Sequence, residues 1–95
     1  MPISSEPLFF LGHTVATRGA LAALRATGQQ PAEFLNRHQA GDWGAMSELD
    51  QRSNVEALQL RGRIFSAYAL QDGTRLYVIT EADRSVTTLL LPSEY

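Results

Sequence analysis

Residues 63–91 read RIFSAYALQDGTRLYVITEADRSVTTLLL, and this stretch decides the fold. It contains three runs rich in β-branched and aromatic residues, at 64–70, 75–81 and 86–91, and each run is bounded by residues typical of turns. Asp72-Gly73 is a strong signal for a two-residue hairpin turn, and Asp83-Arg84 lies at the corresponding place between the second and third runs. The stretch therefore predicts a three-stranded antiparallel meander.

The two predicted turns also set the register of the strands. They place Tyr68 opposite Tyr77 and Ile79 opposite Thr88, although Arg84 is a poor residue for the second turn. Because side chains alternate between the faces of a sheet, each face can be listed. The face expected under the helices holds Phe65, Ala67, Ala69, Leu76, Val78, Leu89 and Leu91, with Thr80 and Thr87 at its end. The other face is expected to hold Ser66, Tyr68, Arg75, Tyr77, Ile79, Glu81, Thr88 and Leu90.

Helical patterns precede this stretch. Thr17 is a predicted N-cap for a helix over 18–27, and Pro31 is the predicted first residue of a helix over 31–40. Ser47 marks a further helix start, running to about residue 58, but its apolar spacing fits the helical period poorly. The apolar run at 7–12 is either an edge strand or a plug that packs on the core. We therefore expect an α+β domain spanning residues 1–95, with two or three N-terminal helices, then the meander, and with a short N-terminal strand left open.

The composition limits the function classes. The chain of 95 residues has no cysteine, so disulfides, thiol nucleophiles and thiolate metal sites are excluded. All eight basic residues are arginine, and the net charge of −2 disfavours a strongly basic nucleic-acid binder. No apolar run reaches the length of about 20 residues that spans a membrane, and the first residues lack the features of a signal peptide. We therefore expect a cytoplasmic protein without membrane association.

The most distinctive stretch before the strands is HQAGDWG at 38–44. His38 is a candidate general acid or base that Asp42 would orient, with the Trp43 indole beside it. The alternative is structural: Asp42 caps local amides, Trp43 packs in the core, and His38, which shares a helix side with Phe34, borders the core. The two histidines do not have the spacing of metal ligands, and Gly-rich phosphate loops are absent, so neither a metal site nor a cofactor is expected.

The densest polar cluster is TEADRSVTT at 80–88. Glu81 and Asp83 there form a candidate acid pair or cation site. The alternative is a solvated hairpin end in which Thr80 and Thr87 make a cross-strand pair.

Several motifs resemble those of a family of small uncharacterised bacterial proteins that are often labelled "plasmid-related". They include GALAAL at 19–24, GDWG at 41–44 and TEADRS at 80–85, and the resemblance covers about residues 7–95. Two positions depart from the usual pattern of that family, with Arg18 before the glycine of the first helix and Tyr77 in the second strand. The resemblance implies a bacterial source and brings no established activity.

The order of helices followed by a short antiparallel sheet is also similar to that of barnase, colicin and RelE-like ribonucleases. That similarity implies a metal-independent ribonuclease or toxin-related domain in which His38, Arg63, Glu81 and Thr88 act on RNA. The acidic net charge argues against it, because such enzymes attract phosphate with basic surfaces.

The favoured hypothesis is a binding or interaction module. It would form a homo-oligomer or hold a protein partner through the sheet face that carries Tyr68, Tyr77, Ile79 and Leu90. The candidate binding residues are Asp42, Trp43, Tyr68, Tyr77 and Arg84.

Overall fold

The structure, a computed structural model, describes residues 6–95. Residues 1–5, which enter the expectation that no signal peptide is present, lie outside this range. The elements are, in chain order, β1 (His13–Ala16), α1 (Arg18–Thr27), α2 (Pro31–Gln39), α3 (Glu48–Leu60), β2 (Ile64–Ala69), β3 (Arg75–Thr80), β4 (Val86–Leu90) and the short 3-10 helix η1 (Pro92–Glu94). This arrangement confirms the α+β class.

The prediction of a three-stranded antiparallel meander is wrong. The sheet has four strands in the order β1-β4-β3-β2, and β1 pairs parallel to β4, so the sheet is mixed. A strand also precedes the helices, and η1 follows the sheet. An N-terminal strand exists, but at His13–Ala16 and not in the apolar run at 7–12, where the sequence pattern suggested an edge strand. A parallel partner from the start of the chain leaves no local turn signal, which is why the sequence did not show it.

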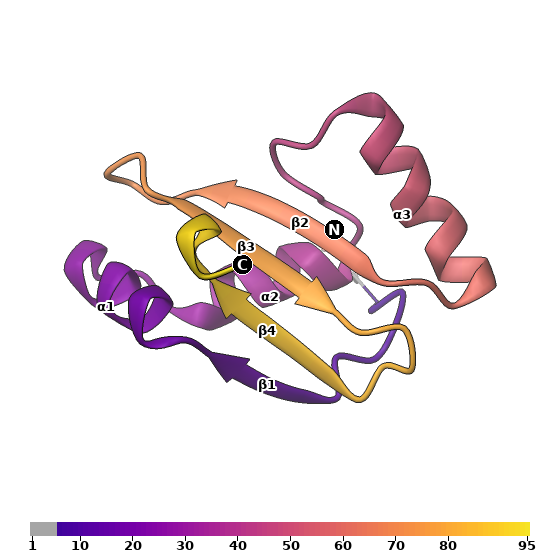
Figure 1. Cartoon of the computed structure of the whole chain (residues 1–95), viewed down its shortest axis with the longest axis horizontal. Helices are drawn as coiled ribbons and strands as arrows, with labels where there is room; N and C mark the ends of the chain where they lie inside the picture. Colours follow the sequence, from indigo (N-terminus) through magenta and orange to yellow (C-terminus); the bar gives the residue numbers. More distant parts are fainter. Residues whose placement is uncertain (1–5) are drawn as a thin grey trace, which may run out of the picture.

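The helices lie on one side of the sheet and at one of its edges (Figure 1). Helices α1 and α2 cover one face, with α1 packed against β4 and α2 against β3, while α3 packs against the edge strand β2. We call the face under α1 and α2 the helix face and the opposite face the outer face. η1 packs against β3, and in Figure 1 it lies in front of the sheet on the outer face.

The first hairpin differs from the predicted register by one residue. Tyr68 lies opposite Leu76, and Tyr77 lies opposite Ala67. The cause is the loop: the Leu70 amide donates to the Thr74 carbonyl, so three residues, with Gly73 at φ +89°, connect the strands in place of two. Every β2 side chain therefore points to the face opposite to the predicted one.

The register between β3 and β4 is as predicted. Ile79 lies opposite Thr88, and Tyr77 lies opposite Leu90. The turn accommodates Arg84 with φ +61°, a backbone conformation that is rare for a residue with a side chain.

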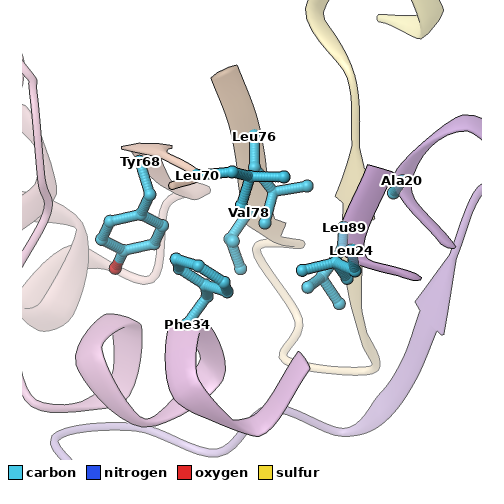
Figure 2. Close-up of a cluster of buried hydrophobic side chains, with 8 residues drawn as sticks. All are labelled: Ala20, Leu24, Phe34, Tyr68, Leu70, Leu76, Val78 and Leu89. Atoms are coloured by element: carbon cyan, nitrogen blue, oxygen red, sulfur yellow. The ribbon is translucent and has the colours of Figure 1, made fainter. Parts of the chain in front are cut away.

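The main core lies between the helix face and helices α1 and α2 (Figure 2). Phe34 of α2 points toward the sheet between Tyr68 and Val78, and its ring centroid is 5.5 Å from that of Tyr68. The buried cluster consists of Ala20, Leu24, Phe34, Tyr68, Leu70, Leu76, Val78 and Leu89. Tyr68, which was expected on the open face, is therefore part of the core because of the shifted register.

The helix starts are capped as predicted. The Thr17 hydroxyl accepts a hydrogen bond from the Ala20 amide, and the Ser47 hydroxyl accepts one from the Asp50 amide. A second buried cluster of Phe9, Trp43, Ala57 and Ile64 holds α3 against β2. Phe9 comes from the apolar run at 7–12, so this run packs on the core as a plug. No helix among residues 6–95 combines the length and the apolar character needed to cross a membrane.

Candidate functional site

A groove opens between α3 and the outer face of the sheet. Its volume is about 450 Å³, within the range of about 300–1,000 Å³ that is usual for ligand pockets. The groove is lined by Ala45, Met46, Ser47, Asp50, Ser53, Asn54, Arg63, Phe65, Ala67, Arg75 and Tyr77. It thus combines an aromatic and aliphatic floor with a few charged and hydroxyl groups at its walls.

Backbone pairing at the edge of β2 fixes the groove wall. The side-chain amide of Asn54 in α3 donates to the Phe65 carbonyl at 2.7 Å and accepts from the Phe65 amide at 3.0 Å. The Ala67 amide donates to the Trp43 carbonyl, and the Ala67 carbonyl accepts from the Ala45 amide at 2.7 Å. These bonds satisfy the outward backbone groups of Phe65 and Ala67 and set the distance between α3 and the sheet.

Gly44 permits this close approach. A Cβ atom at Gly44 would lie 2.1 Å from the Ala67 carbonyl oxygen, and the residue has φ +74°. Only glycine meets both conditions without strain.

Aromatic rings form the floor of the groove. The Phe65 and Tyr77 rings meet edge to face with centroids 4.8 Å apart. The ring centroid of Tyr95, which follows η1, lies 5.7 Å from that of Phe65 and 6.1 Å from that of Tyr77. The Tyr95 side chain is 67% exposed. These contacts, which are typical of favourable aromatic pairs, fix the orientation of the Tyr77 ring.

The charged groups of the groove are partly paired. Arg63 forms an ion pair with Glu81, its Nε lying 3.4 Å from a carboxylate oxygen. Arg75 forms no ion pair within residues 6–95, and Asp50 lies on the α3 wall. Arg75 is therefore the cation in the groove whose charge is available to a bound group.

His38 is fully buried on the helix face, away from the groove. Its Nδ1 lies 2.6 Å from the Ser66 hydroxyl, and its Nε2 lies 2.9 Å from the Thr80 hydroxyl. The hydrogen bonds continue from the Thr80 hydroxyl to the Thr87 hydroxyl, with 2.7 Å between the oxygens. The Thr87 hydroxyl in turn donates to the Leu11 carbonyl at 2.8 Å. Thr80 and Thr87 thus form the cross-strand pair that the sequence suggested.

The direction of these bonds identifies the tautomer of His38. Thr87 donates its one hydroxyl proton to the carbonyl of Leu11, so it accepts from Thr80. Thr80 has then used its own proton and accepts from Nε2–H of His38, which leaves Nδ1 to accept from Ser66. Burial, and next the positive charge of Arg84, lower the pKa of His38 to about 4. The imidazole is therefore neutral near pH 7 and holds the core together.

The other residues of the 38–44 stretch are tied to the backbone or the core. The Asp42 carboxylate accepts from Nε of Arg37 at 2.7 Å and from the Gly44 amide at 3.2 Å. The bond to Arg37 is the main reason that the pKa of Asp42 is lowered. Trp43 is buried, and its ring centroid lies 6.0 Å from that of His38. These positions match the structural alternative for this stretch.

Two further candidate binding residues point away from the groove. Tyr68 donates its hydroxyl proton to the Asp42 carbonyl at 2.6 Å, and burial raises its pKa to about 12. The Arg84 guanidinium donates to the carbonyls of Gly62, Glu81, Ala82 and Ala57, at 2.7 to 3.2 Å. Arg84 thereby ties the β3–β4 hairpin to the end of α3.

The structure does not bring His38, Arg63, Glu81 and Thr88 together. Arg63 and Glu81 are paired, and Thr88 pairs with Ile79 on the outer face. His38 bonds to Ser66 and Thr80 on the helix face, so the sheet separates it from the other three. No single substrate phosphate can therefore lie within hydrogen-bond reach of all four residues.

Of the residues that line the groove, only Arg63 and Tyr77 were candidate site residues from the sequence. Phe65 was assigned to the wrong face through the register error, and Asn54 and Arg75 belong to no motif. An asparagine in a helix that ends just before an edge strand is a usable signal, because its amide can pair with backbone groups.

Within residues 6–95, no cluster of three or more His, Cys, Asp or Glu could hold a metal ion. Neither a protein-family model, nor a curated protein, nor a solved structure matches this chain.

Proposed function

We propose that this protein is a binding module whose groove between α3 and the outer face takes a segment of a partner protein. The segment would present a carboxylate side chain beside an apolar one. The observation that carries the proposal is the position of Arg75, a cation without an ion pair in the described residues, in the same groove as the Phe65 and Tyr77 rings.

The residue types of the groove support a protein partner. Arginine, tyrosine, phenylalanine and methionine are enriched at the centres of protein interfaces, and Arg63, Arg75, Tyr77, Phe65 and Met46 all line this groove. The Arg75 guanidinium would bind the carboxylate, while the rings and Met46 would cover the apolar side chain.

The groove replaces the sheet face that the sequence suggested as the binding surface. Tyr68 lies in the core, and Ile79 and Leu90 are only 3% and 7% exposed within a single chain. Tyr77 alone of the four borders an open surface, and it does so in the groove.

A selection from a random peptide library displayed on phage tests the proposal. The wild-type protein is expected to enrich peptides with an Asp or Glu next to an apolar residue. A synthetic peptide from the selection is then titrated against Arg75→Gln and against Arg25→Gln, which removes an exposed arginine on α1. Loss of a charge-assisted hydrogen bond weakens binding by about tenfold, so this loss is expected for Arg75→Gln alone. Enrichment without acidic residues, or equal binding by both variants, would refute the proposal.

A further inference from the structure

One edge strand of the sheet is covered by other parts of the chain, and the other edge strand is open. The edge of β2 is covered, since Asn54 and the Trp43–Ala45 segment bond the outward backbone groups of Phe65 and Ala67. The other edge is β1, and Figure 1 shows no element beyond it. Three of its four residues are exposed.

The backbone of β1 presents a row of unused hydrogen-bonding groups. The His13 amide donates to the Ser85 carbonyl, and the Thr17 amide donates to the Leu89 carbonyl. Since backbone groups alternate in direction along a strand, the amides and carbonyls of Thr14 and Ala16 point away from β4. Outside the ladder between β1 and β4, no residue of the described chain, 6–95, forms a hydrogen bond to them.

β1 lacks most of the features that usually keep an open edge from pairing. Proteins protect such edges with very short strands, charged side chains, proline, bulges or a covering segment, and of these β1 has only the short length, of four residues. The sequence of β1 is HTVA, without Lys, Arg, acid or proline, and its Val15 is 47% exposed. An uncharged edge of this kind, without proline, is suited to pairing with another strand.

We propose that β1 pairs antiparallel with β1 of a second copy of this chain, so that two four-stranded sheets join into one. With the two-fold axis at Val15, Thr14 lies opposite Ala16 of the second copy and the outward backbone groups of both strands are bonded. Val15 then packs against its own counterpart, because residues that face each other in an antiparallel pair contact on the same face.

Charge at the two ends of β1 selects this partner and this direction. Arg18 is the first residue of α1, separated from the end of the strand by Thr17, and Asp83 lies in the loop whose Ser85 bonds to His13 at the beginning of the strand. Antiparallel pairing of two copies brings Arg18 of one edge toward Asp83 of the other, whereas parallel pairing would put Arg18 beside Arg18. Glu94, the other charged group at the Arg18 end, already accepts hydrogen bonds from the Thr17 hydroxyl and the Gly19 amide. The proposal is independent of the groove, which lies at the opposite edge of the sheet.

The test compares Thr14→Pro with Thr14→Val. Proline removes the outward amide and leaves the bonds between β1 and β4 intact, while valine keeps the amide at nearly the same size. Analytical ultracentrifugation is expected to find a dimer for the wild type and Thr14→Val, and a monomer for Thr14→Pro with an unchanged circular dichroism spectrum. Hydrogen exchange of the wild type is expected to show that the Thr14 and Ala16 amides become protected as the protein concentration rises.

Three outcomes would overturn the proposal. They are a wild-type monomer at every soluble concentration, a dimer that Thr14→Pro leaves unchanged, and Thr14 and Ala16 amides that exchange equally fast at low and high concentration. If Thr14→Pro fails to fold, Val15→Lys replaces it, because two ammonium groups would then face each other across the axis. A dimer that survives Val15→Lys refutes the register centred on Val15.

Discussion

His38 of α2 donates its Nε2 proton to the hydroxyl of Thr80 in β3 across 2.9 Å of the protein interior. This bond joins a helix to the sheet in a place where neither group meets water, since both residues are 0% exposed. A second proton on His38 would place a positive charge in the interior near Arg84 and would require the Ser66 hydroxyl to turn from donor to acceptor. The native structure therefore holds the neutral imidazole.

The stability of the protein is expected to fall in mildly acidic solution. His38 has an ordinary pKa of 6.5 and a native pKa of about 4, so the unfolded chain binds the proton more readily. The free energy of unfolding is thus at its full value above pH 6.5 and decreases as the pH drops to 4, by about 3 kcal/mol. Urea unfolding at a series of pH values measures the decrease. His38→Gln should be less stable at pH 7 but should lose much less stability than the wild type between pH 6.5 and about pH 5, above the range in which the carboxyl groups are protonated. An equally flat wild-type profile between these values would contradict the assignment.

Asn54→Ala is expected to loosen the wall of the groove. The change removes both bonds to the backbone of Phe65 and should lower the free energy of unfolding by about 2 kcal/mol. Hydrogen exchange at the Phe65 amide should become faster. Ser53→Ala is the matched control, because Ser53 lines the same groove and a surface change of this kind alters stability by at most about 0.5 kcal/mol. Equal effects of the two changes would show that Asn54 does not hold α3 to β2.

Comparing Gly44→Ala with Gly73→Ala distinguishes two costs to stability: the collision of a Cβ atom with neighbouring backbone, and the strain of a positive φ. Both glycines have positive φ, +74° and +89°, but an added Cβ at Gly73 meets nothing within 4 Å. Gly73→Ala should cost only the strain of about 1–2 kcal/mol. Gly44→Ala should cost more, because its Cβ would collide with the Ala67 carbonyl and displace the segment that pairs with β2. Thermal unfolding ranks the variants, and a smaller effect at Gly44 would be inconsistent with the short approach.

Arg84→Lys is expected to destabilise the protein by about 2 kcal/mol although the charge is kept. Lysine cannot reproduce the planar set of donors that binds the carbonyls of Ala57, Gly62 and Glu81 together. Arg61→Lys is the control, since Arg61 also has a positive φ, of 58°, and its side chain makes no hydrogen bond within residues 6–95. Chemical denaturation should show a loss for the first variant alone; a loss of equal size for both would show that the bonds from Arg84 to the carbonyls are not the cause.

The sequence predicted the helices well and the β2 register poorly, for physical reasons. Thr17 and Ser47 announce helix starts because their hydroxyls cap the first turn, which is a local interaction. In β2 the apolar residues occupy both alternations, with Ile64 and Tyr68 on one face and Phe65 on the other. Neither hydrophobic alternation nor Asp72-Gly73 therefore distinguishes a two-residue from a three-residue loop.

The candidate site depended on that register. Once β2 is shifted by one residue, Phe65 joins Tyr77 and Arg75 on the outer face, and Tyr68 moves into the core. The burial of His38 was foreseeable, because it shares a helix side with Phe34. Its partners Ser66 and Thr80 were not, because contacts between distant segments leave no local pattern. The family resemblance and the expected cytoplasmic location stay predictions.

The parallel pairing of β1 with β4 determines how the domain resists mechanical force. When the N-terminal end of β1 and the C-terminal end of β4 are pulled apart, the two strands must slide past each other along their length, because they run in the same direction. All the bonds of the ladder are then loaded at once, whereas the antiparallel hairpins would open one bond at a time. The short strand that was hardest to read from the sequence is thus the one that locks the sheet under tension.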